Sequence, residues 1–118
     1  MNKVMLLGRL VKDVELRYSQ GENPVAVGKY TLAVSRQFRK EGEPDADFIN
    51  IIGFGKAAEF AEKYFKKGQQ IVVVGRLQVR NYENEEGRKN FFTEVIVDEQ
   101  YFAGNKKDKS SDGGNEVK

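Results

Sequence analysis

The chain has 118 residues, with 20 Lys and Arg against 18 Asp and Glu, and it contains no Cys, His or Trp. This length fits one domain, and without Cys the chain can form no disulfide and use no thiol nucleophile. Because His is absent as well, most zinc sites and the commonest proton shuttle are excluded. An enzyme is therefore the least expected class of protein, and no metal site or cofactor is expected.

The remaining composition bears on location. No apolar run approaches the length of a membrane helix, and the start MNKVMLLGRLV becomes charged too soon for a signal peptide. Together with the lack of Cys, this predicts a cytoplasmic protein in a reducing compartment, without membrane contact. The net charge of +2 says little by itself, so the positions of the basic residues matter more.

Three β-rich runs come first in the chain, at residues 3–11, 25–36 and 47–54. A polar, turn-rich stretch at 12–24 separates the first two runs and leaves room for a short extended piece around Glu15–Tyr18. The charged residues 37–46, which include Gly42 and Pro44, predict a mobile loop before the third run.

Residues 56–67 form the one convincing helix, because apolar side chains recur there at helical spacing. These side chains are Ala57, Phe60, Ala61, Tyr64 and Phe65. Lys66 and Lys67 suit the negative end of the helix dipole, and Gly68 suits the residue after the helix C-terminus.

Residues 70–82 and 91–102 predict two further strands, joined by a loop around NEEGRK. The resulting order β-β-β-α-β-β is that of the OB-fold, an all-β, five-stranded Greek-key barrel with one helix between the third and fourth strands. A general α+β sandwich is the alternative. The similar stretches VMLLGRLV and VVVGRLQV each place a glycine, Gly8 or Gly75, where a barrel strand has to bend.

The strand at 71–82 changes character along its length. Its odd positions are apolar and predict core: Ile71, Val73, Gly75, Leu77 and Val79. The even positions of its second half are Arg76, Gln78, Arg80 and Tyr82. Because side chains alternate faces along a strand, these four share one face. A plain solvated face supplies charges, but not usually an aromatic beside two charges of the same sign.

The segment DFINIIGFGK, residues 47–56, places Phe48 and Phe54 on one face with Asn50 and Ile52. At about 3.3 Å per residue the two rings lie about 20 Å apart, which suits two stacking positions along an extended nucleic-acid strand better than mutual contact. The loop before it surrounds an aromatic with basic residues: Arg36, Phe38, Arg39 and Lys40. The ending GFGK lacks the first glycine and the Ser or Thr of a phosphate loop.

Aromatic side chains stack on any base while Lys and Arg neutralise phosphates, so this interleaving favours sequence-tolerant binding of single-stranded nucleic acid. Core packing is an equal alternative for Phe54, and cross-strand packing is one for Tyr82. The other phenylalanines considered are assigned to the core or to contacts under the helix: Phe60, Phe65, Phe91 and Phe102.

Four stretches together closely resemble the bacterial and phage single-stranded DNA-binding protein (SSB) family. They are NKVMLLGRLVKDVELRY, TLAVSR, FINIIGFGKAAEFAEKYFKKGQQIVVVGRLQVRNYENEEG and TEVIVDE, and the resemblance covers about residues 2–102. It implies an OB-fold, usually a homotetramer, that coats single-stranded DNA without catalysis during replication, recombination and repair, in the nucleoid. An OB-type protein-interaction module and an RNA-binding OB domain are the alternatives.

The resemblance also implies site residues. The stacking aromatics of the family fall on Phe38, Phe48, Phe54 and Tyr82. The basic residues expected to meet phosphate, by position in the family or by the strand alternation above, are Lys3, Arg9, Arg36, Arg39, Lys56, Lys67, Arg76 and Arg80.

The end of the chain departs from the family. Residues 1–104 are expected to form the DNA-binding domain, and the polar residues 105–118 predict a disordered tail. Many family members end in an acidic, hydrophobic tip that recruits repair and replication proteins, whereas this chain ends in SSDGGNEVK. A shortened chain, a tail-less paralogue and a mobile-element or phage version all fit, and recruitment through a tip is in question.

Overall fold

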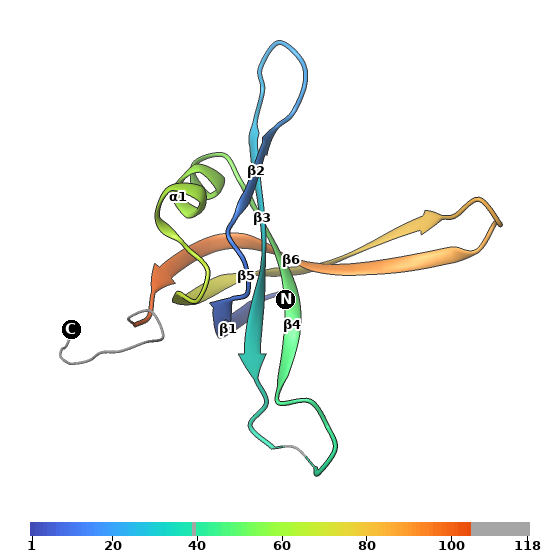
Figure 1. Ribbon diagram of the computed structural model, residues 1–118. Helices are drawn as coiled ribbons and strands as arrows, with labels where there is room; N and C mark the ends of the chain where they lie inside the picture. The colour runs from blue at the N-terminus through green and yellow to red at the C-terminus, as the bar shows by residue number, and fades with distance from the viewer. Residues whose placement is uncertain (39, 105–118) are drawn as a thin grey trace.

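The structure is a computed structural model that describes residues 1–38 and 40–104 (Figure 1). Arg39 and the predicted disordered tail lie outside the described residues. The elements are β1 (Val4–Leu10), β2 (Glu15–Tyr18), β3 (Ala26–Ser35), β4 (Ala46–Phe54), α1 (Lys56–Tyr64), β5 (Gln70–Glu83) and β6 (Lys89–Phe102). All the predicted strands are present, and the short extended piece is a strand of its own, β2.

Five of the strands close into a barrel in the order β1-β5-β6-β4-β3 and back to β1. Closure rests on the pairs Arg9↔Ala33 and Leu10↔Leu32, while β2 pairs along β3 outside the ring. β4 and β6 run parallel through Ile51↔Val95, and the other neighbouring strands are antiparallel. Along the chain, the helix α1 comes between the third and fourth strands of the closed barrel, β4 and β5. The predicted OB-fold is therefore confirmed, and the sandwich alternative is not.

At both glycines predicted to lie at bends, the backbone of another strand comes too close for a side chain. A Cβ placed on Gly8 would lie 2.7 Å from the carbonyl oxygen of Ala33, and one on Gly75 would lie 2.0 Å from that of Ile96. The register between β5 and β6 also shifts at Val74/Gly75. Both glycines therefore stand where strands of the barrel pass close to one another.

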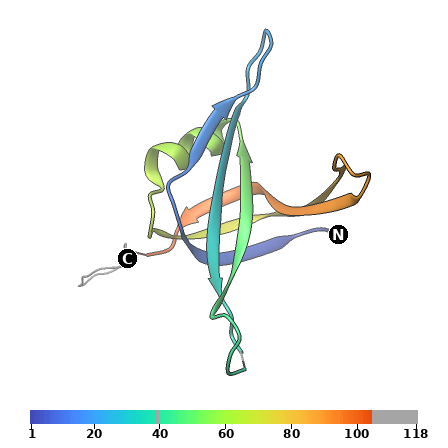
Figure 2. The ribbon, with the colours of Figure 1, turned by 45° about the vertical axis from the view of Figure 1, so that its right-hand side comes forward.

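The core fills the barrel, and α1 covers one end of it (Figures 1 and 2). Its buried residues are Leu10, Tyr30, Leu32, Ile51, Ala61, Phe65, Ile71, Val73 and Val95. Phe65 meets Tyr30 edge to face at 6.2 Å, and burial raises the pKa of Tyr30. Phe60 and Phe102 contact Phe65, as expected for residues at the helix.

The helix ends earlier than its sequence pattern predicted. α1 stops at Tyr64, and Phe65 adopts an extended backbone that directs its ring into the core, while its N–H donates to the Ala61 carbonyl at 2.8 Å. The placement of Lys66 and Lys67 in the last helical turn is therefore wrong. Burial of one large ring outweighs another helical turn of mostly exposed residues.

Three hairpins or loops extend from the barrel as arms, between β2 and β3, between β3 and β4, and between β5 and β6 (Figures 1 and 2). The β5–β6 arm corrects two predictions. Leu77 and Val79, expected in the core, are about half exposed, and Phe91 is 68% exposed. Alternation continues along β5, but beyond Gly75 the strand leaves the barrel, so its apolar face has no core to meet.

Within the described residues, no helix is long and apolar enough to cross a lipid bilayer.

Candidate nucleic-acid interface

The outer face of β3 and β4 carries two of the predicted stacking residues. Phe48 pairs in register with Ala33, and Phe54 pairs with Val27, so neither has a large neighbour on β3 to cover its ring. Phe48 is 66% exposed and Phe54 is 48% exposed. Core packing, the alternative for Phe54, is not what the structure shows. The two rings stand six residues apart on one strand, or about 20 Å.

The other two predicted stacking residues lie on the arms. Phe38 is exposed in the loop between β3 and β4, and Tyr82 is exposed near the end of β5. Tyr82 pairs with Asn90, which offers little apolar surface for cross-strand packing. By alternation Tyr82 shares a face with Arg80 and Phe92, which is the face turned to the outer side of β4. The four aromatics thus follow β4 and continue onto two arms.

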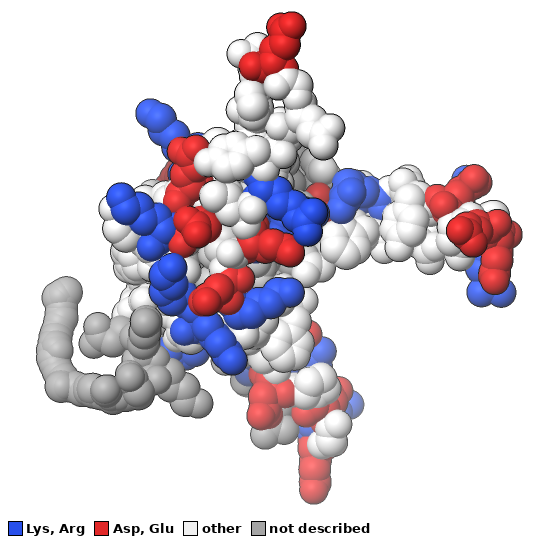
Figure 3. Space-filling model, turned by 45° about the horizontal axis from the view of Figure 1, so that its top comes forward, with Lys and Arg blue, Asp and Glu red and all other residues white. Residues whose placement is uncertain are grey.

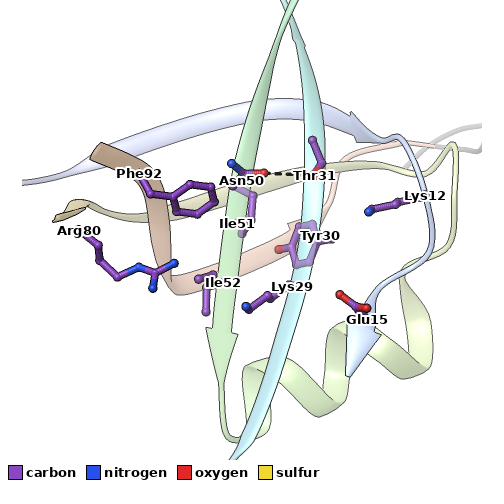
Figure 4. Close-up of a pocket in the computed structure, with 10 residues that line it drawn as sticks. All are labelled: Lys12, Glu15, Lys29, Tyr30, Thr31, Asn50, Ile51, Ile52, Arg80 and Phe92. Atoms are coloured by element: carbon purple, nitrogen blue, oxygen red, sulfur yellow. Dashed lines mark hydrogen bonds between the residues drawn. The ribbon is translucent and has the colours of Figure 1, made fainter. Parts of the chain in front are cut away.

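A hollow of about 180 Å³ lies on this outer face (Figure 4). Figure 4 shows Arg80 and Phe92 of the β5–β6 arm on one side of β4, and Lys12 and Glu15 on the other. The full lining is Lys12, Glu15, Lys29, Tyr30, Thr31, Asn50, Ile51, Ile52, Arg80 and Phe92. Among the described residues, neither Lys12 nor Lys29 forms an ion pair. Glu15, which pairs in register with Lys29, is the acidic residue of the lining.

Three of the predicted phosphate-binding arginines are held in ion pairs, and two of them, Arg36 and Arg76, pair with exposed carboxylates. Arg36 bonds Asp47 at 2.8 Å and approaches Glu43 at 3.7 Å, and its hydrogen bond and charge lower the pKa of Asp47. Arg76 lies 3.7 Å from Asp98. Each of these two arginines would have to exchange a carboxylate for a phosphate on binding.

Arg80 is paired differently, because its partner is buried. Its Nη2 lies 3.1 Å from Oε1 of Glu94, whose side chain is 2% exposed. The guanidinium carbon also lies over the Phe92 ring, 5.1 Å from its centroid.

The remaining predicted cations do not gather into one patch. Lys3 precedes the start of β1, which pairs with Gly75 at the foot of the β5–β6 arm. Lys56 opens α1 directly after Phe54. Arg9 donates to the Gly68 carbonyl at 3.1 Å beyond the far end of the helix, close in sequence to the exposed Lys67. Arg39 lies outside the described residues.

The surface carries charges of both signs. Figure 3 shows acidic side chains at the tips of the arms, with basic side chains beside them on the right-hand and lower arms, and both kinds interspersed on the body. The acidic tips include Glu22, Glu43 and Glu86, one on each arm.

Sequence reasoning missed Lys12, Lys29, Phe92 and Glu94. Lys12 has no aromatic next to it in the sequence, and Lys29 precedes Tyr30, whose ring belongs to the core. Phe92 and Glu94 share alternate positions of β6, and a face shared with Arg80 could have been inferred only from the β5–β6 register. Once that register is known, the alternation of side chains places Phe92 and Glu94 on the face of Arg80.

The barrel and this face define a class of protein. OB-folds bind oligonucleotides on the outer face of their second and third barrel strands and with the adjoining loops, which here are β3, β4 and the arms. Residues 1–103 match the Single-strand binding protein family. This chain belongs to the single-strand binding protein family.

Individual relatives agree with this assignment. Single-stranded DNA-binding protein 3 of Clostridium acetobutylicum is 46% identical over 102 residues, covering 86% of this chain and 70% of the relative. Single-stranded DNA-binding protein 1 of Streptococcus pyogenes serotype M18 is 48% identical over 99 residues, covering 83% and 75%. Single-stranded DNA-binding protein 1 of Staphylococcus aureus strain Mu50 is 52% identical over 103 residues, covering 86% and 65%.

Proposed function

We propose that the protein binds single-stranded DNA without sequence preference and protects it during replication, recombination and repair. The observation that carries this proposal is the pair of exposed rings, Phe48 and Phe54, spaced along the outer face of the barrel beside a hollow lined by two lysines. The family membership and the names of the relatives support it. Neither alternative function, protein docking or RNA binding, is favoured by any of these observations.

Binding combines two kinds of contact. Phe38, Phe48, Phe54 and Tyr82 stack on bases, at about 1–3 kcal/mol per base, and do so with any base because every base has a π-face. Five exposed lysines form no ion pair within residues 1–38 and 40–104 and would neutralise phosphates most readily: Lys3, Lys12, Lys29, Lys56 and Lys67. Arg9, Arg36, Arg39 and Arg76 are further candidates, although Arg36 and Arg76 must first leave a carboxylate. No catalytic step is involved.

The protein assembles as a homotetramer in this proposal. Two separate apolar faces remain uncovered, and a tetramer with dihedral symmetry needs two kinds of contact. One face is the outer side of β1 with its neighbours and includes Met5, Leu7 and Tyr101. The other is the apolar side of the β5–β6 arm and includes Leu77, Val79 and Phe91. Association of copies would bury both.

Residues 1–104 would constitute the DNA-binding domain, which agrees with a family match that ends at residue 103. The nucleoid location, the disorder of residues 105–118 and the question of recruitment through them stay predictions.

A titration tests the proposal. Poly-dT, a matched RNA oligomer and a duplex are compared at several salt concentrations, and the mass in solution is measured by light scattering. We expect tight binding to poly-dT, weak binding to duplex, and a slope of log K against log[salt] of about −0.7 per phosphate neutralised. Equal affinity for duplex, a preference for RNA or an absence of salt dependence would contradict it. A monomer mass would contradict only the assembly.

A further inference from the structure

The side chain of Glu94 is an unusual feature of the proposed binding face. It lies in β6 and is 2% exposed, although it carries a carboxylate. Among the described residues, the polar contact of that carboxylate is with Arg80 Nη2 at 3.1 Å. A buried carboxylate without a counterion is strongly unfavourable, so Glu94 holds Arg80 in place.

Arg80 is constrained from a second direction by Phe92. The two residues pair directly across the β5–β6 hairpin, and the guanidinium carbon lies over the ring at 5.1 Å from the centroid. This is the geometry of a cation–π contact. The Arg80 side chain nevertheless remains 53% exposed, and it lines the hollow beside β4 (Figure 4). One face of the guanidinium is therefore covered, one edge is bonded, and the rest is open.

This arrangement makes Arg80 a poor contact for phosphate and a good one for a base. Its charge is balanced by a carboxylate that cannot turn to solvent, so bonding a phosphate instead would leave Glu94 buried and unpaired. A guanidinium is planar and weakly hydrated, and bases stack on such planes. The lysines that line the hollow, Lys12 and Lys29, can meet the phosphates beside a base bound there.

We propose that the Arg80 guanidinium, backed by Phe92 and fixed by the buried Glu94, is a stacking site for one nucleobase. Glu94 is a positioning residue that acts through Arg80. This inference rests on the proposed DNA binding and gives Arg80 a role other than the phosphate contact expected from the sequence.

The test compares two changes with a matched control. The first variant is Glu94→Gln, which keeps a polar group but removes the charge. The second is the double variant Arg80→Gln with Glu94→Gln, which leaves no unpaired buried charge and so retains the best prospect of folding. The control is Arg88→Gln with Glu86→Gln, which removes an exposed pair of the same hairpin at 4.0 Å. Thermal unfolding verifies that each variant is folded.

Each protein is titrated with a thymidine oligomer and with an abasic oligomer of the same length, over a series of salt concentrations. With the thymidine oligomer, the double variant should bind about fivefold or more weakly than the unchanged protein, with the same salt slope. With the abasic oligomer it should bind as the unchanged protein does. Glu94→Gln frees the charge of Arg80 for a phosphate, so its salt slope should steepen by about 0.7.

Other results overturn the inference. An equal loss on both oligomers, with a slope shallower by about 0.7, would make Arg80 a phosphate contact. No loss on either oligomer would make the Arg80–Glu94 pair a purely structural one. If the unchanged protein bound neither oligomer, the proposed function itself would fail, and that result is distinct from the other two.

Discussion

Replacing Phe48 by alanine separates binding from stability more clearly than any other change on the proposed face. The ring is 66% exposed and its cross-strand neighbour is Ala33, so truncation opens no cavity in the core. The free energy of unfolding should therefore change by less than about 0.5 kcal/mol, as for other surface positions. The stacking lost is about 1–3 kcal/mol, which raises Kd by about 5- to 150-fold.

Fluorescence anisotropy of a labelled thymidine oligomer measures this change, and urea unfolding verifies the stability. Tyr18→Ala is the matched control. Tyr18 is an exposed aromatic of the same sheet, but it pairs with the buried Ala26 on the side of α1, where its hydroxyl donates to Glu59 at 3.3 Å. The control should bind DNA normally. Unchanged affinity in folded Phe48→Ala, or an equal loss in Tyr18→Ala, would refute stacking at Phe48.

Three further predictions follow from the same geometry. Phe48 and Phe54 are about 20 Å apart, so the losses of binding free energy in Phe48→Ala and Phe54→Ala should add within about 0.5 kcal/mol in the double variant. A clear deviation would indicate that the two rings contact the same base. The hydrogen bond from Arg36 lowers the pKa of Asp47. The stability that the ionised Asp47 contributes is therefore present above about pH 4 and is lost as pH falls through the lowered pKa. Thermal scans of Asp47→Asn should lack that part of the acid dependence, and an unaltered pH profile would show that the pair does not stabilise the fold. Gly75→Ala would place a Cβ 2.0 Å from the Ile96 carbonyl oxygen. Urea unfolding should therefore show a loss of unfolding free energy at or beyond the usual value of about 1–3 kcal/mol for an overpacked core, about the largest for any glycine of this protein. A neutral result would mean that the two strands can move apart at this point without cost.

The order of the elements could be predicted because it depends on local patterns. Alternation identified the strands, helical spacing identified α1, and a short repeated stretch identified the two glycines at which strands pass closely. The helix end could not be predicted, since Phe65 leaves the helix in order to fill a core formed by distant strands.

The exposed aromatics were also accessible from the sequence, because Phe48 shares its part of the strand with polar neighbours. Alternation distinguishes the two faces of a strand, but it does not say where a strand leaves the barrel. For that reason Leu77, Val79 and Phe91 were assigned to the core, although they lie on a projecting arm. Their exposure depends on the length of β5 relative to the barrel it helps to close.

The sequence by itself determined the barrel and the exposed aromatics of the proposed face, because both follow from side-chain type and spacing along one chain. The tertiary structure decided which charges lie near one another. Arg80 is bound to Glu94, 14 residues away, through the register of two strands, while Lys12 and Lys29 come together at a hollow from separate segments. A charge acts through its distance to other charges, and folding, not sequence position, sets those distances.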